Sequence, residues 1–164
     1  MTPEKDAELC SKYPKIFRDR NGSPQETCMC WGLDCGDGWF DLIDTLCANI
    51  QRHVDWLVAE QKRRFTYDDS FTEDDMKPEE DLQVVAAQVK EKFGGLRFYF
   101  EGGDDEVSGM VQMAESMSYH VCEDCGNKGI LRKGGWYRTM CDPCNDTWQA
   151  RRAQNWDLGM KDIK

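Results

Sequence analysis

Four cysteines near the end of the chain constrain its fold more than any other feature. Residues 122–145 read CEDCGNKGILRKGGWYRTMCDPCN, so two Cys-x-x-Cys pairs stand 15 residues apart. This spacing is typical of a structural zinc site, in which each pair supplies half of a tetrahedral shell. Four thiolates leave no open position for a water molecule, so the expected cofactor is a structural Zn²⁺. The predicted ligands are Cys122, Cys125, Cys141 and Cys144.

The residues after each pair favour the tight turns that such a site requires. Gly126 follows the first pair and Asn145 follows the second. Both residue types adopt the left-handed backbone conformation at little cost, which lets nearby amides turn toward the thiolates. The segment between the pairs is expected to form a short hairpin that turns at residues 133–135, and the whole forms a zinc ribbon.

The other cysteines leave two interpretations open. The chain has nine cysteines, an odd number, and it begins without the apolar run of a signal peptide, so metal binding is favoured over disulfides. A second metal site would have to use a spacing that is not standard, and the alternative is that these side chains are small buried apolar groups. The residues concerned are Cys28, Cys30, Cys35 and Cys47.

Charge divides the chain into two predicted parts. Residues 1–118 carry 13 Lys and Arg against 25 Asp and Glu, whereas residues 119–164 carry 8 against 6. We therefore expect an acidic α+β body over 1–118 and a zinc ribbon with a short C-terminal helix over 119–164. The acidic body argues against extensive binding to nucleic acid, because phosphates would be repelled.

Apolar periodicity predicts the helices of an α+β fold. The helical spacing of apolar residues is clearest over 36–65, with Asp37 as the expected N-cap, and it recurs over 104–121, where Asp104 or Asp105 would cap. A short third helix is expected over 145–156, and residues 1–12 are expected to be loose.

Residues 82–103 can be interpreted in two ways, and a β-hairpin is favoured over a helix. Val85, Ala87, Val89 and Phe93 alternate along one face, and a Gly-Gly pair at 94–95 suits a tight turn. The expected fold is therefore amphipathic helices packed on a hairpin. Residues 66–81 carry eight carboxylates without periodicity, which predicts an exposed loop or a negative patch that steers a basic partner.

The sequence offers little for catalysis. It contains no glycine-rich phosphate loop and no nucleophile elbow, and its only histidines are His53 and His120. A hydrolase that uses Asp37 and Glu91 remains a third class of hypothesis, and the chain is expected to lack enzymatic activity. No window is apolar enough to span a membrane, so a cytoplasmic location is expected.

Several segments resemble a group of small zinc-ribbon proteins of tailed bacteriophages and prophages. They are YPKIF (13–17), CWGLDCGDGWFDLIDTLCANIQ (30–51), QVKEKFGGLRFYFEGG (88–103) and the cysteine pairs. The resemblance covers about 13–145 and implies an accessory protein that acts in the cytoplasm of a bacterial host.

Two functions follow as expectations. The first is a protein that binds a bacterial host or phage protein and modulates it, as an inhibitor of a defence or nucleic-acid enzyme would. The alternative is a regulatory protein whose ribbon binds nucleic acid through basic and aromatic residues. The residues proposed for that role are Arg132, Lys133, Trp136, Tyr137 and Arg138.

Overall fold

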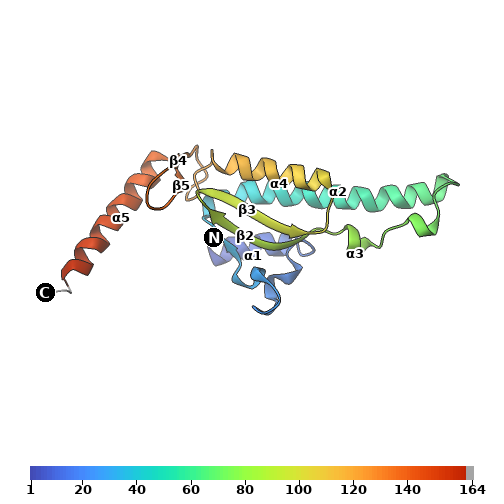
Figure 1. Ribbon diagram of the computed structural model, residues 1–164, viewed down its shortest axis with the longest axis horizontal. Coiled ribbons are helices and arrows are strands. Elements are labelled where there is room, and N and C mark those ends of the chain that lie inside the picture. The colour runs from blue at the N-terminus through green and yellow to red at the C-terminus, as the bar shows by residue number, and fades with distance from the viewer. Residues whose placement is uncertain (162–164) are drawn as a thin grey trace.

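The computed structural model describes the backbone of residues 1–161 and the side chains of residues 1–154. Its fold is α+β, as the sequence predicts (Figure 1). The helices are α1 (Pro3–Lys12), α2 (Phe40–Tyr67), α3 (Glu79–Leu82), α4 (Asp105–Ser118) and α5 (Asp142–Lys161). The strands are β1 (Leu33–Asp34), β2 (Val85–Lys92), β3 (Gly95–Glu101), β4 (Ile130–Arg132) and β5 (Arg138–Met140).

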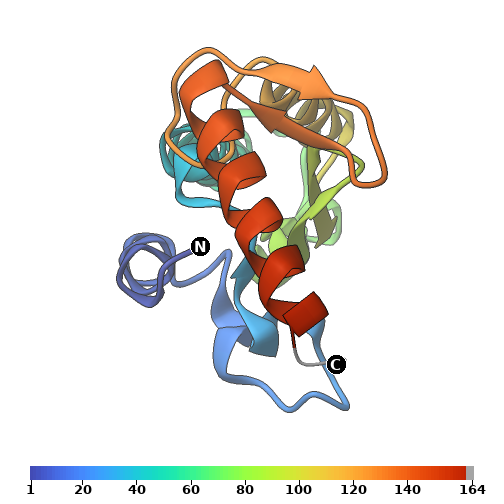
Figure 2. The ribbon, with the colours of Figure 1, turned by 90° about the vertical axis from the view of Figure 1, so that its left-hand side faces the viewer.

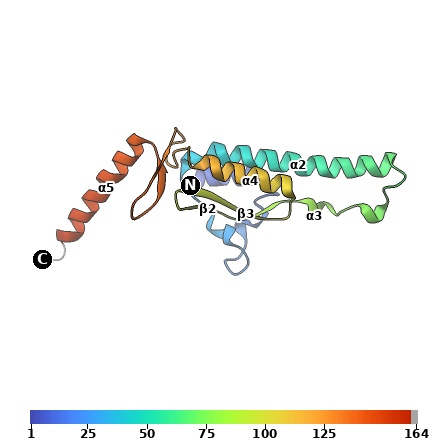
Figure 3. The same ribbon diagram turned by 45° about the horizontal axis from the view of Figure 1, so that its top comes forward.

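A small sheet and a pair of helices build the body. The strand order is β1-β2-β3, with β1 parallel to β2 and β2 antiparallel to β3. Helices α2 and α4 lie side by side along this sheet, as Figures 1 and 3 show. The core lies between these layers, and its largest fully buried side chains include Trp39, Phe98, Ile43 and Ile50.

The β2–β3 hairpin confirms the strand interpretation of residues 82–93 but corrects two details. Lys92 pairs with Gly95, so the turn residues are Phe93 and Gly94, with φ of 55° and 79°. The turn therefore lies one residue earlier than predicted, and Phe93 is 65% exposed instead of sharing the buried face. An irregularity in the pairing near Ala87 also moves the buried position to its neighbour Ala86.

Helix α2 follows the predicted apolar stripe, but its start differs from the prediction. A short 3₁₀ turn, Asp37–Trp39, precedes the helix, and Asp37 does not cap it. The Asp37 carboxylate instead accepts hydrogen bonds from the backbone N–H and the hydroxyl of Thr2, at 2.6 and 3.1 Å. Asp37 therefore makes a contact with Thr2, which is distant in sequence, in place of the predicted local cap.

Helix α4 begins as predicted. Asp104 is its N-cap and accepts hydrogen bonds from the backbone N–H groups of Glu106 and Val107, at 3.1 and 3.0 Å. The apolar stripe is only partly buried, because Met117 at its end is 47% exposed.

The N-terminal segment is a helix and not the loose chain that its polar composition suggests. Leu9 of α1 is fully buried in the main core. Asp6 is also buried: it pairs with Arg20 at 2.8 Å and accepts a hydrogen bond from the backbone N–H of Leu33 at 2.9 Å. Such tertiary partners cannot be inferred from local sequence, which explains why the prediction that residues 1–12 are loose was wrong.

The ribbon end of the molecule carries the β4–β5 hairpin and helix α5 (Figure 2). Helix α5 begins at Asp142 and ends at Lys161, so it is longer at both ends than the predicted 145–156. Trp148 is half-buried, with the guanidinium of Arg138 5.6 Å from its ring centre. The acidic segment 66–81 lies at the opposite end of the molecule and is largely exposed (Figure 1).

Candidate metal centre

The four predicted ligands come together in space. The sulfur atoms of Cys122, Cys125, Cys141 and Cys144 all lie within 4.8 Å of one another. The Sγ atoms of Cys125 and Cys141 are 3.6 Å apart. Four sulfurs placed tetrahedrally about a zinc ion at 2.3 Å would be separated by roughly 3.8 Å. The cluster therefore has the donor set and the spacing to hold a metal ion.

The two cysteine pairs are shaped by different backbone structures. Gly126 has a φ of 79° and donates from its backbone N–H to the carbonyl of Cys122 at 2.9 Å, which is the predicted tight turn. Asn145 does not adopt the predicted left-handed conformation, because helix α5 has already begun at Asp142. Its N–H donates to the carbonyl of Cys141 at 3.0 Å, so the helix start supplies the turn of this pair.

Local hydrogen bonding prepares one thiol for deprotonation. A hydrogen bond from the backbone N–H of Asn127 lowers the pKa of Cys125 to about 7. Burial raises the pKa of Cys122, so this thiol needs the positive charge of a metal to ionise at neutral pH. Metal ligation requires thiolates, and metal affinity is therefore coupled to pH.

The start of helix α2 is docked on the first cysteine pair. The backbone N–H of Gly38 donates to the carbonyl of Glu123 at 2.7 Å. A Cβ atom at Gly38 would overlap the carbonyl oxygen of Cys122 and would stand 2.7 Å from the amide nitrogen of Cys125. Only glycine lets the two segments approach so closely, which explains the Gly-Asp-Gly-Trp sequence before the helix.

Two side chains complete this joint. The indole N–H of Trp39 donates to the carbonyl of Val121 at 2.9 Å, and the ring is fully buried. Glu123 is also buried, and it accepts a hydrogen bond from the backbone N–H of Gly36 at 3.1 Å. Burial raises the pKa of the Glu123 carboxyl, and the guanidinium of Arg138, 3.8 Å away, opposes this effect.

The turn of the β2–β3 hairpin forms a second joint with the ribbon. The hydroxyl of Thr139 donates to the carbonyl of Gly94 at 2.5 Å, and a Cβ at Gly94 would overlap the side chain of Leu131. A Cβ at Gly95 would overlap the ring of Tyr119. The predicted boundary between body and ribbon is thus crossed by close contacts at two places.

The remaining cysteines are not gathered into a second site. Cys35 and Cys47 are buried, Cys28 is exposed and Cys30 is partly buried. Among the side chains of residues 1–154, the four-cysteine cluster is the only group of three or more residues found that could hold a metal ion. Burial raises the pKa of Cys35 to about 12, as expected for a cysteine that serves as a small apolar group.

The carboxylates considered for a hydrolase are engaged in structural hydrogen bonds. Asp37 holds Thr2, and Glu91 accepts from the backbone N–H of Gly94 at 2.6 Å within the hairpin turn. His53 is buried: its Nε2 lies 2.8 Å from Asp104, and its ring stacks on Trp56. His120 is exposed.

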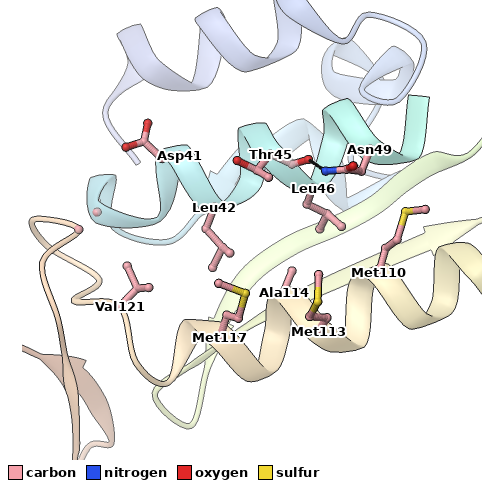
Figure 4. A pocket seen from close by; sticks show the side chains of 12 residues that line it. Asp41, Leu42, Thr45, Leu46, Asn49, Met110, Met113, Ala114, Met117 and Val121 are labelled. Atoms are coloured by element: carbon pink, nitrogen blue, oxygen red, sulfur yellow. Dashed lines mark hydrogen bonds between the residues drawn. The ribbon is translucent and has the colours of Figure 1, made fainter. Parts of the chain in front are cut away.

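The structure also contains an apolar groove that the sequence analysis missed (Figure 4). It lies between α2 and α4, and its volume is about 380 Å³. Leu42 and Leu46 line it from α2, and Met110, Met113 and Met117 line it from α4. Met113 and Met117 are 61% and 47% exposed. The helical spacing of these methionines resembles a core stripe, so only the packed structure reveals that they face an open groove.

Comparison with known proteins leaves the metal centre and the groove as the basis for inferring function. No family model, curated protein or solved structure matches the chain. None of the helices among residues 1–161 is both long enough and apolar enough to cross a membrane.

Proposed function

We propose that the protein binds a bacterial host or phage protein and modulates it, without catalysing a reaction. The observation that carries this proposal is the open, methionine-lined groove between α2 and α4. We also propose that the four-cysteine cluster holds a structural zinc ion, because four thiolates would close its coordination shell. The cluster fixes the start of α2, which forms one wall of the groove.

The groove has the chemistry of a surface that receives a helix. Its lining is largely apolar, and thioether side chains adapt to the shape of a bound segment. Helix α4 has 14 residues and is about 21 Å long, enough to contact several turns of a partner. An amphipathic helix laid in an apolar groove is a common mode of peptide recognition.

Charge indicates which helix the groove would accept. Helix α4 carries no basic residue, and Asp105 and Glu106 lie in its first turn. Asp41 lies at one end of the groove (Figure 4), and the adjoining hollow at the other end is lined by both Glu106 and Arg52, so the uncompensated negative charge is at the Asp41 end. The proposed occupant is therefore an amphipathic helix of the partner protein with basic residues beside its apolar face.

A pair of synthetic peptides tests this occupant. Both have about 15 residues and the same apolar helical face, and their polar face carries lysine in one and glutamate in the other. Calorimetry should show saturable binding of the lysine peptide, and Met113→Lys should weaken it about tenfold or more by placing a charge in the groove. The control Phe65→Lys changes an exposed apolar residue of α2 that does not line the groove.

A second experiment addresses the partner and its modulation. A photo-crosslinking residue at position 113 should capture a bacterial protein that the same residue at position 65 does not. The captured protein, once purified, should change its activity when this protein is added, and Met113→Lys should remove the effect. Equal binding of the two peptides, or no effect of the substitution, would contradict the proposed groove function.

A further inference from the structure

A second surface lies at the ribbon end of the molecule, where two turns face each other. A hollow of about 590 Å³ separates the β2–β3 turn from the loop that joins β4 to β5. Its lining includes three aromatic side chains that are largely exposed: Phe93 is 65%, Trp136 66% and Tyr137 40% exposed. Three exposed rings around one hollow form an aromatic surface, called here the aromatic platform.

Phe93 occupies its place on the platform in spite of its backbone. Its φ of 55° is in the left-handed region, and it is the only residue other than glycine with a positive φ among the residues that the structure describes. A tight turn of this kind favours Asn-Gly, and a bulky side chain there is uncommon. An exposed aromatic ring held in an unfavourable conformation points to a function and not to folding.

The charge around the platform is opposite to that of the whole protein. Residues 90–99 and 128–140 contain seven Lys and Arg and one carboxylate, Glu91; the three arginines pair with carboxylates from outside these ranges, and within the described part of the chain the four lysines do not. The ammonium groups of Lys90 and Lys92 lie 5.8 and 5.6 Å from the ring centres of Tyr99 and Phe93. The net charge of the chain is −10. The platform is therefore a local basic and aromatic surface.

The lysines, and not the arginines named in the sequence analysis, are the cations available to a ligand. Arg132 pairs with Asp142, and Arg138 pairs with Asp124 at 3.2 Å. Among the described side chains, no carboxylate lies within 4.0 Å of the ammonium group of Lys90, Lys92 or Lys133.

We propose that the aromatic platform binds single-stranded nucleic acid. Bases stack on the rings of Phe93, Trp136 and Tyr137, and the phosphates lie near Lys90 and Lys92. Aromatic faces combined with cations are the usual means of binding single strands without sequence preference. Lysine is depleted in the core of protein–protein interfaces, which favours a nucleic acid over a protein here. Several rings with cations on one side suit an oligonucleotide better than a single nucleotide.

Fluorescence anisotropy with a labelled oligothymidine of about 10 nucleotides tests the proposal. Binding should weaken as salt is raised from about 50 to about 200 mM, because lysines displace counterions from the phosphates. Trp136→Ala and Phe93→Asn should each weaken binding about tenfold. The control Tyr67→Ala removes a ring that is 80% exposed at the far end of α2, and it should have no effect.

Phe93→Asn separates binding from folding. Asparagine suits the left-handed turn, so this variant should melt about 3 °C higher than the wild type while binding the oligonucleotide less tightly. Unchanged oligonucleotide binding in both platform variants would overturn the proposal. Binding of thymidine monophosphate as tight as that of the oligonucleotide would overturn it too, because the site would then be a nucleotide pocket. The outcome is independent of the peptide experiment on the groove.

Discussion

At the scale of single residues, glycines decide how closely the metal centre approaches the rest of the protein. Gly38 is in contact with the backbone of the first cysteine pair, and Gly95 is in contact with the ring of Tyr119. By contrast, Gly109 on α4 has no atom within 4 Å of the place where a Cβ would stand. Gly38 and Gly95 are therefore required for close packing, whereas Gly109 is not.

Gly38→Ala should lower the free energy of unfolding by about 2 kcal/mol, because the added methyl group meets backbone atoms that cannot move aside. It should also speed the loss of metal to a chelator. Urea denaturation measures the first effect. The matched control Gly109→Ala lies inside a helix and in open space, so it should raise stability by about 0.5–1 kcal/mol. Equal effects of the two substitutions would contradict this account of the joint.

Asp104 gives a prediction about pH. Burial raises the pKa of its carboxyl, but the hydrogen bond with His53 and those from the start of α4 outweigh this effect, so the pKa lies below its usual value. A carboxyl with a lowered pKa stabilises the fold above its unfolded pKa of about 3.9, and that stability is lost as the pH falls through the lower folded value.

Asp104→Ala should therefore cost about 1 kcal/mol at neutral pH through loss of the cap. Asp104→Asn keeps the cap and loses only the charge. Unfolding measured over a range of pH should show the difference between wild type and Asp104→Asn shrinking below about pH 4. A difference that stayed constant down to pH 2 would show that the charge is unimportant.

At the scale of elements, the four-cysteine ribbon packs against the body through the segment before α2 and through the β2–β3 turn. The sequence predicted the four ligands and the β4–β5 hairpin, because both depend on local spacing and turn residues. It did not predict that the Gly36–Trp39 segment and the β2–β3 turn would pack against them, since these contacts join residues more than 40 positions apart.

Metal removal should affect both the ribbon and the start of α2. Elemental analysis of protein purified without chelator should find one zinc ion per chain. Removing it, or substituting Cys122→Ser, should unfold the ribbon and shift the tryptophan fluorescence of the protein to longer wavelength, because the buried indole of Trp39, which donates to the carbonyl of Val121, becomes exposed to water. Zinc affinity should fall as the pH is lowered, because protons compete with the metal for the thiolates.

Protein that folds fully without metal would contradict the structural role of the cluster. The matched control is Cys28→Ser, because Cys28 is an exposed cysteine outside the cluster. It should leave both the zinc content and the tryptophan fluorescence unchanged.

At the scale of the whole molecule, charge is separated along the long axis. The acidic segment 66–81 and the four-cysteine ribbon occupy opposite ends (Figure 1). The proposed groove lies between them, on the helices that connect the two ends. Such a distribution would attract the proposed basic partner to one region, and it leaves the lysine-bearing platform at the other.

Neutralising part of the acidic segment should change association and not folding. The carboxylates of Asp69, Asp74 and Glu80 make no hydrogen bond with any described residue, so their replacement by Asn or Gln should alter stability by less than about 0.5 kcal/mol. The association rate with the lysine peptide should fall, and most strongly at low salt, whereas the dissociation rate stays nearly the same. Stopped-flow fluorescence measures both rates, and an unchanged association rate would contradict steering by this segment.

The sequence by itself determined the four-cysteine cluster, the α+β class, the hairpin and the main helices. Each of these depends on residues close together in the chain: the cysteine spacing, a period of two or 3.6, and glycine at a turn. Only the tertiary structure decided that residues 3–12 form a helix and that Asp37 accepts hydrogen bonds from Thr2. It also decided that methionines line an open groove and that Phe93 and Trp136 lie on one surface. These features come from contacts between segments far apart in sequence, and such contacts form only when the packed core brings those segments together.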